Sequence, residues 1–92
     1  MTAAPVRYRV IMRGYVQGVW FRQSCRRHAV DLDLAGWVRN RADGTVEAVF
    51  EGAEENVARA VSWCRVGPPA AEVTGIEVSA EEPTGVPGFS VR

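Results

Sequence analysis

Two hydrophobic periods alternate along the 92 residues, and their order limits the possible folds more than any other feature of the sequence. A period of two residues predicts a strand, and a period of about 3.6 residues predicts an amphipathic helix. The first period occurs at residues 6–13, 36–40, 45–51 and 73–80, and the second at residues 21–32 and 54–64. The turn Ala42-Asp43-Gly44 predicts a hairpin between the second and third strands, and residues 88–92 predict a short final strand.

This order of strand, helix, strand, strand, helix and strand predicts an α+β fold. The arrangement that suits this order and length is a ferredoxin-like βαββαβ sandwich, with an antiparallel sheet and two helices on one face. A chain of 92 residues with 47% hydrophobic residues has the size of one modest core. We therefore expect a single domain over residues 1–92.

Composition argues against several classes of function. No run approaches the roughly 20 apolar residues of a membrane-spanning helix, and the N-terminus lacks the apolar segment of a secretion signal, so we expect a cytoplasmic protein without a membrane partner. Eleven basic residues, all arginine, balance eleven acidic residues, which gives no reason to expect nucleic acid as a partner. Two cysteines, Cys25 and Cys64, are too few for a disulfide framework, and we expect both to be reduced and buried.

The segment GYVQGVWFR, residues 14–22, interrupts the regular pattern between the first strand and the first helix. Gly14 and Gly18 bracket a loop that leads into a helix N-terminus, where free backbone N–H groups and the helix dipole favour an anion. Arg22 adds a planar set of donors that suits a tetrahedral oxyanion, and no Asp or Glu occurs between residues 14 and 30. The loop alone is equally compatible with a tight connection in which Arg22 makes a surface ion pair.

A second segment, GWVRNRADGTVEAVFEG at residues 36–52, makes the pattern specific. Together with GYVQGVWFR it closely resembles the two signature motifs of the acylphosphatase family, in the same order and without a gap. The resemblance continues in VSWCRVGPP and GFSVR, so it extends over nearly the whole chain. It implies the same ferredoxin-like fold and an enzyme that cleaves the carboxyl–phosphate bond of small acyl phosphates.

The resemblance also implies roles for individual residues. Arg22, which ends the first motif, would bind the phosphate, and Asn40 would position the attacking water. The backbone of the loop would form the phosphate cradle, which comprises Tyr15, Val16, Gln17, Gly18, Val19 and Trp20. The three tryptophans, Trp20, Trp37 and Trp63, are expected to pack in the core or against loops, and Trp20 is also placed to shape the acyl side of the pocket.

The residue types at this site independently favour an acyl phosphate as substrate. The site has no histidine, cysteine, carboxylate cluster or set of metal ligands, whereas a phosphate ester with an alkoxide leaving group normally needs a general acid or a metal ion. The leaving group of an acyl phosphate is a carboxylate, whose conjugate acid has a pKa of about 4, so it departs without a proton at neutral pH. We therefore expect no metal and no cofactor, and catalysis by positioning and charge.

Three local features have simpler explanations that stay open at this point. Asn40 precedes a hairpin, where asparagine is ordinary turn chemistry. Cys25, His28 and Cys64 could approach one another as metal ligands, although packing is the commoner role of such residues. Four arginines on and next to the strands are expected to make cross-strand pairs with glutamates or to face solvent, namely Arg7, Arg9, Arg39 and Arg41.

Two other classes of function also stay open. One is a noncatalytic or accessory acylphosphatase-like module, which keeps the anion pocket but serves a partner. The other is an RNA-binding ferredoxin-like domain, which would need exposed aromatic residues on the sheet and a basic surface. The first strand presents arginines instead, and the total charge is balanced. We expect the enzyme, acting as a monomer on a small-molecule substrate.

Overall fold

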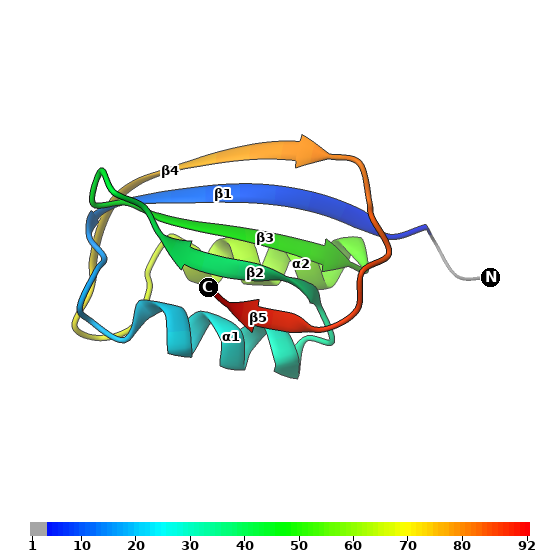
Figure 1. Cartoon of the computed structure of the whole chain (residues 1–92), viewed down its shortest axis with the longest axis horizontal. Coiled ribbons are helices and arrows are strands. Elements are labelled where there is room, and N and C mark those ends of the chain that lie inside the picture. The colour runs from blue at the N-terminus through cyan, green and yellow to red at the C-terminus, as the bar shows by residue number, and fades with distance from the viewer. Residues whose placement is uncertain (1–3) are drawn as a thin grey trace.

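The computed structural model describes residues 4–92, so the first three residues of the predicted domain lie outside the described residues. The elements of this part of the chain are β1 (Val6–Tyr15), α1 (Phe21–Asp31), β2 (Ala35–Asn40), β3 (Val46–Gly52), α2 (Glu54–Cys64), β4 (Glu72–Glu81) and β5 (Phe89–Val91). Both helices cover the same face of the sheet (Figure 1). The predicted α+β fold and its element order are therefore confirmed. Within residues 4–92, no helix has the length and apolar character needed to cross a membrane.

The sheet has the strand order β4-β1-β3-β2-β5. The four longer strands pair antiparallel, as predicted. β5 differs, since it pairs with β2 in parallel, with Gly36 opposite Phe89 and Val38 opposite Val91. The path of the chain explains the difference, because the connection from β4 runs along one end of the sheet to the opposite edge, where β5 enters in the direction of β2 (Figure 1).

The face of the sheet that meets the helices is apolar. Val10 and Met12 of β1 are fully buried there, together with Val46, Ala48 and Phe50 of β3. Each helix contributes three buried residues at helical spacing, namely Phe21, Cys25 and Ala29 from α1 and Val57, Ala60 and Cys64 from α2. All of these side chains belong to one core cluster. The two hydrophobic periods therefore identified the faces that pack together.

The opposite face of the sheet carries arginines and glutamates that pair across strands. Arg39 of β2 donates to Glu47 of β3 at 2.6 Å, and Arg9 of β1 approaches the same carboxylate at 3.1 Å. Arg7 of β1 contacts Glu51 of β3 at 3.2 Å. Both glutamates are almost fully buried, so the arginines supply the opposite charge that a buried carboxylate requires. The expected cross-strand pairing is confirmed for these three arginines.

Glu51 also holds the connection between β4 and β5. Its carboxylate accepts hydrogen bonds from the backbone N–H groups of Thr84 at 2.9 Å and Gly85 at 2.8 Å, in addition to the Arg7 guanidinium. Burial by itself raises the pKa of Glu51, but these hydrogen bonds to the charged form outweigh burial, so the pKa is lowered below its usual value. The carboxylate therefore stabilises the crossover that leads the chain to β5.

The two cysteines are free and buried in the core, as expected. Hydrogen bonding to Cys64, together with burial, raises the pKa of the Cys25 thiol well above its usual value, so this thiol stays protonated. His28 lies at the exposed edge of α1 and packs against Trp63 in a tilted arrangement, with ring centroids 4.5 Å apart. Among residues 4–92, no group of three or more His, Cys, Asp and Glu side chains is arranged to hold a metal ion.

We predict that Glu51→Gln lowers the free energy of unfolding by about 2 kcal/mol at neutral pH, because the neutral amide cannot offset the Arg7 charge and leaves part-buried N–H donors without an acceptor. The pKa of Glu51 is lower in the folded than in the unfolded chain. The stabilisation is therefore complete above the unfolded pKa of about 4.3 and is lost as the pH falls through the folded value. Urea unfolding of both proteins at about pH 7, 5 and 3 measures the difference, which should shrink on acidification.

Glu77→Gln is the matched control, since Glu77 pairs with Arg13 at 2.9 Å but has 60% of its side chain exposed. The free energy of unfolding of this variant should change by about 0.5 kcal/mol or less at each pH. A difference for Glu51→Gln that stays constant from neutral to acidic pH would contradict the role assigned to its carboxylate.

Candidate active site

The two glycines of the loop between β1 and α1 serve different purposes. Gly14 has a φ of 119°, and a Cβ at this position would overlap the carbonyl oxygen of Glu72 in β4. Gly14 is therefore required by the close approach of two strands. Gly18 has a φ of 73°, and apart from its two chain neighbours no residue among 4–92 has an atom within 4 Å of the place a Cβ would take. Only the backbone conformation favours glycine there, and the space beside it is open.

α1 begins with backbone donors that have no partner in the helix. Its N-cap residue, Trp20, has left-handed backbone angles (φ 65°, ψ 20°) and makes no side-chain cap. The N–H of Ser24 donates to the Trp20 carbonyl at 3.1 Å, which leaves the N–H groups of residues 21–23 without a helical acceptor. The first turn has no acidic residue. The helix start is therefore electropositive.

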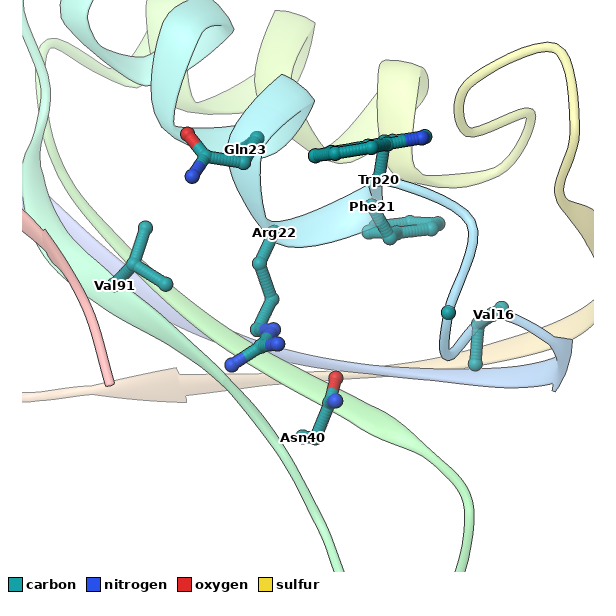
Figure 2. Close-up of a pocket in the computed structure, with 8 residues that line it drawn as sticks. Val16, Trp20, Phe21, Arg22, Gln23, Asn40 and Val91 are labelled. Carbon is teal, nitrogen blue, oxygen red and sulfur yellow. The ribbon is translucent and has the colours of Figure 1, made fainter.

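A pocket of about 410 Å³ opens at this helix start and is lined by Val16, Gly18, Trp20, Phe21, Arg22, Gln23, Asn40 and Val91. Figure 2 shows the Arg22 side chain, from α1, and the Asn40 side chain, from the end of β2, pointing toward one another. No carboxylate belongs to this lining in the described part of the chain, so Arg22 sets its charge. A positive pocket of this kind suits an anion.

Arg22 is held in place by the residue that follows β5. Its Nη1 donates to a backbone oxygen of Arg92 at 3.2 Å, and the N–H of Arg92 donates to the carbonyl of Val38 in β2 at 2.8 Å. Arg22 takes part in none of the ion pairs found within residues 4–92. The alternative in which Arg22 makes a surface ion pair with an aspartate or glutamate side chain is therefore not found in the described part of the chain. Its other guanidinium N–H groups remain as donors for a ligand.

Gln17 ties the loop to the hairpin between β2 and β3. Its Nε2 donates to the carbonyl of Arg41 at 2.8 Å and to the carbonyl of Thr45 at 2.9 Å. The two carbonyls also accept bonds within the hairpin, from the N–H groups of Gly44 and Arg41. One side chain therefore fixes the loop that carries Gly18 against the turn that follows Asn40.

Asn40 is the last residue of β2, and other residues build the turn that follows. Arg41 N–H donates to the Thr45 carbonyl at 2.9 Å, and Thr45 Oγ1 donates to Asp43 at 2.6 Å. Bonds from the Thr45 hydroxyl and N–H lower the pKa of Asp43. Arg41 contacts Asp43 at 3.8 Å, not the β3 glutamates expected as its partners. Since the Asn40 carboxamide makes no hydrogen bond within residues 4–92, turn chemistry does not explain it.

The pocket unites five of the residues expected at the site, namely Val16, Gly18, Trp20, Arg22 and Asn40. The other three are absent from this lining, since the Tyr15 side chain is exposed at the end of β1, Gln17 faces the hairpin and Val19 is in the core. The expected role concerned their backbone N–H groups, and it stays a prediction. Three further residues line the pocket without having been expected, namely Phe21, Gln23 and Val91. The place of Phe21 and Gln23 in the first turn of the predicted helix could have indicated that they line the pocket. Val91 reaches the pocket only through the parallel pairing of β5 with β2.

Comparison with known proteins agrees with this geometry. The family model described as Acylphosphatase matches residues 8–91. The acylphosphatase of Trichormus variabilis is 53% identical over 87 residues, which cover 95% of this chain and 86% of that protein. The structure of an acylphosphatase from Coxiella burnetii has a TM-score of 0.93 and 35% identity, and the match covers 97% of this chain and 94% of that chain.

A segment of a larger protein is also similar. The structure of T. kodakarensis HypF has a TM-score of 0.79 and 33% identity, and the match covers 94% of this chain but 11% of that chain. The fold therefore occurs both in chains of this length and inside longer ones.

The chain belongs to the acylphosphatase family, with the ferredoxin-like fold that its sequence predicted. Its relatives of similar length carry the name acylphosphatase. The activity that follows from this membership is that of an acylphosphatase, a hydrolase of acyl phosphates.

We predict that Gln17→Ala lowers kcat at least tenfold and keeps the fold, because the loop loses both bonds that hold it beside Asn40. The hairpin retains its own bonds, so its carbonyls are not left unpaired. Steady-state hydrolysis of benzoyl phosphate measures kcat, and circular dichroism checks the fold.

Gln17→Glu sharpens the test, since it keeps the length of the side chain. An ionised carboxylate cannot donate a hydrogen bond, so at neutral pH the kcat of Gln17→Glu should be as low as that of Gln17→Ala. Near its pKa of about 4.3 the protonated carboxyl can donate one bond, and part of the rate should return relative to Gln17→Ala. Equal rates for the wild type and both variants would exclude a positioning role for Gln17.

Proposed function

We propose that the pocket hydrolyses small acyl phosphates by in-line attack of a water molecule. Arg22 and the N–H groups of the loop and of the first turn of α1 bind the phosphoryl group, and Asn40 positions the water. The observation that supports this best is the convergence of Arg22 and Asn40, from α1 and β2, on one pocket at an electropositive helix start (Figure 2).

The charge on the phosphoryl oxygens changes during the reaction, and the pocket offers hydrogen-bond donors to these oxygens. As the bond from phosphorus to the carboxylate oxygen breaks, its electron pair leaves with the carboxylate, while the water oxygen bonds to phosphorus. The Arg22 guanidinium and the oriented N–H groups stabilise negative charge on the phosphoryl oxygens without needing to reorganise. The Asn40 carbonyl can accept a hydrogen bond from the water and so direct an oxygen lone pair toward phosphorus.

The leaving group explains why so few residue types suffice. A carboxylate departs unprotonated at neutral pH, so the step needs no general acid. No histidine or carboxylate lines the pocket within residues 4–92, and in this proposal the proton of the water passes to a phosphoryl oxygen. The products are a carboxylate and inorganic phosphate. Neither a metal ion nor a cofactor has a role in this scheme.

We also infer that residues 1–92 act as one domain and as a monomer, in the cytoplasm and without a nucleic-acid partner. One core cluster that joins both helices to the sheet supports a single domain. The arginines of the helix-free face, Arg7, Arg9 and Arg39, contact glutamates, which leaves them poorly placed to bind a nucleic-acid backbone.

A noncatalytic anion-binding module is the second candidate, because the chain also matches a segment of a much larger protein. Such a module would bind inorganic phosphate in the same pocket without turning over an acyl phosphate. The two candidates therefore differ in turnover and not in binding.

We predict that the wild type hydrolyses benzoyl phosphate and that the rate persists in excess EDTA, because Arg22 and backbone N–H groups supply the positive charge. The decrease in ultraviolet absorbance of benzoyl phosphate measures the rate. A rate abolished by EDTA and restored by a divalent cation would contradict the metal-free scheme. Binding of inorganic phosphate without turnover would favour the noncatalytic module.

We predict that substitutions of Arg22 and Asn40 lower different kinetic parameters. Arg22→Ala should lower kcat/KM by about 10³ or more and weaken phosphate binding, because the guanidinium contacts the phosphoryl group. Asn40→Ala should lower kcat by about 10² or more with little change in inhibition by inorganic phosphate, because it acts on the water. The matched control is Arg26→Ala, an exposed arginine of α1 outside the pocket, which should retain the wild-type rate. Full activity of Asn40→Ala would refute its assigned role.

A further inference from the structure

Trp20 is the most exposed large hydrophobic side chain in the described part of the chain, with 76% of its surface exposed, and it lines the pocket. The expectation that it packs in the core or against a loop is therefore wrong. The aromatic pairs within residues 4–92 involve Phe21 with Trp63, His28 with Trp63 and Phe50 with Phe89, and not Trp20. Intramolecular packing thus gives no reason for a large ring at this position.

The backbone of Trp20 makes the choice of residue more notable. Its left-handed conformation, with φ 65°, is one that glycine adopts freely and a bulky residue adopts at an energetic cost. Strained positions of this kind cluster at functional sites, where the surrounding structure maintains them. A large ring is therefore kept at the pocket against the local conformational preference.

The in-line reaction decides which part of the substrate meets this ring. If Asn40 positions the water, the leaving carboxylate departs from the opposite side of the phosphoryl group. Figure 2 shows Trp20 on the far side of Arg22 from Asn40, beside the start of α1. In that geometry the acyl group would extend from the phosphoryl position toward Trp20 and away from the hairpin.

We propose that the indole of Trp20 binds the acyl group by stacking, so that the pocket prefers acyl phosphates whose acyl part is aromatic. This inference rests on the proposed function, since it uses the in-line geometry. The Phe21 and Val91 side chains add apolar surface to the same pocket, and the lining within residues 4–92 includes no acidic group that would oppose an anionic substrate. Aromatic rings gain from offset or edge-to-face contacts with indole, whereas an acetyl group is too small to cover it.

The test uses the full chain with two substrates and two inert analogues. The substrates are benzoyl phosphate and acetyl phosphate. The analogues are phenacylphosphonate and acetonylphosphonate, in which a CH2 group replaces the bridging oxygen. By calorimetry the wild type should bind phenacylphosphonate about tenfold more tightly than acetonylphosphonate, the size of one aromatic contact, and its KM should be lower for benzoyl phosphate by a similar factor.

Variants separate the ring from the backbone. Trp20→Ala and Trp20→Gly should both lose the tenfold preference, although only glycine relieves the left-handed backbone. Trp20→Phe should retain most of the preference. Binding of inorganic phosphate should stay within about twofold in Trp20→Ala and Trp20→Phe, because both variants keep the backbone N–H of residue 20 and change only the ring. Val66→Ala is the matched control, since Val66 is 72% exposed but lies outside the pocket. This variant should bind both analogues as tightly as the wild type does.

Loss of the preference in Trp20→Ala, with phosphate binding kept, supports the proposal. A preference that survives in Trp20→Ala, a wild type without preference, or an equal loss for both analogues overturns it. Because the analogues are not hydrolysed, their binding decides the role of Trp20 independently of turnover. A wild type that binds them but hydrolyses neither substrate would contradict the proposed function alone.

Discussion

The pairing of β1 with β3 is the constraint on which the site depends. In this antiparallel register Met12 lies opposite Val46, so the end of β1 lies beside the start of β3. The loop that follows β1 and the hairpin that precedes β3 therefore meet at the same end of the sheet. Gln17 joins them through two carbonyls of the hairpin, and Asn40 lies next to that contact. The position of Asn40 relative to the start of α1 thus depends on this strand register.

The charged residues on the two faces of the sheet have different surroundings. The net charge of the chain is zero and so does not reveal this difference. On the helix-free face Arg7, Arg9 and Arg39 contact buried glutamates, so their charges are neutralised locally. Arg22 lies on the other side, at the start of α1, and contacts a backbone oxygen of Arg92 and, within residues 4–92, no aspartate or glutamate side chain. Within residues 4–92, Arg22 is therefore the residue that gives the pocket lining its positive charge.

A contact far from the pocket also contributes to it. Glu51 accepts hydrogen bonds from the chain that crosses from β4 to β5. This crossover delivers β5 to the edge of β2, where Val91 lines the pocket and the next residue accepts a bond from Arg22. A buried carboxylate on the helix-free face is therefore linked to the orientation of the Arg22 side chain through the path of the backbone.

The sequence by itself determined the order of the elements, the buried faces of β1 and both helices, and the identity of Arg22 and Asn40 within two specific motifs. These features are local, because the backbone geometry of a strand or a helix dictates which side chains share a face. Only the tertiary structure decided that β5 is parallel, that Val91 reaches the pocket, that Gln17 binds the hairpin, and that the Trp20 ring is exposed. It also separated two glycines that look alike in the sequence, since Gly14 serves strand packing and Gly18 serves the open loop. These outcomes depend on which distant segments pair and in which register, and local periodicity contains no information about either.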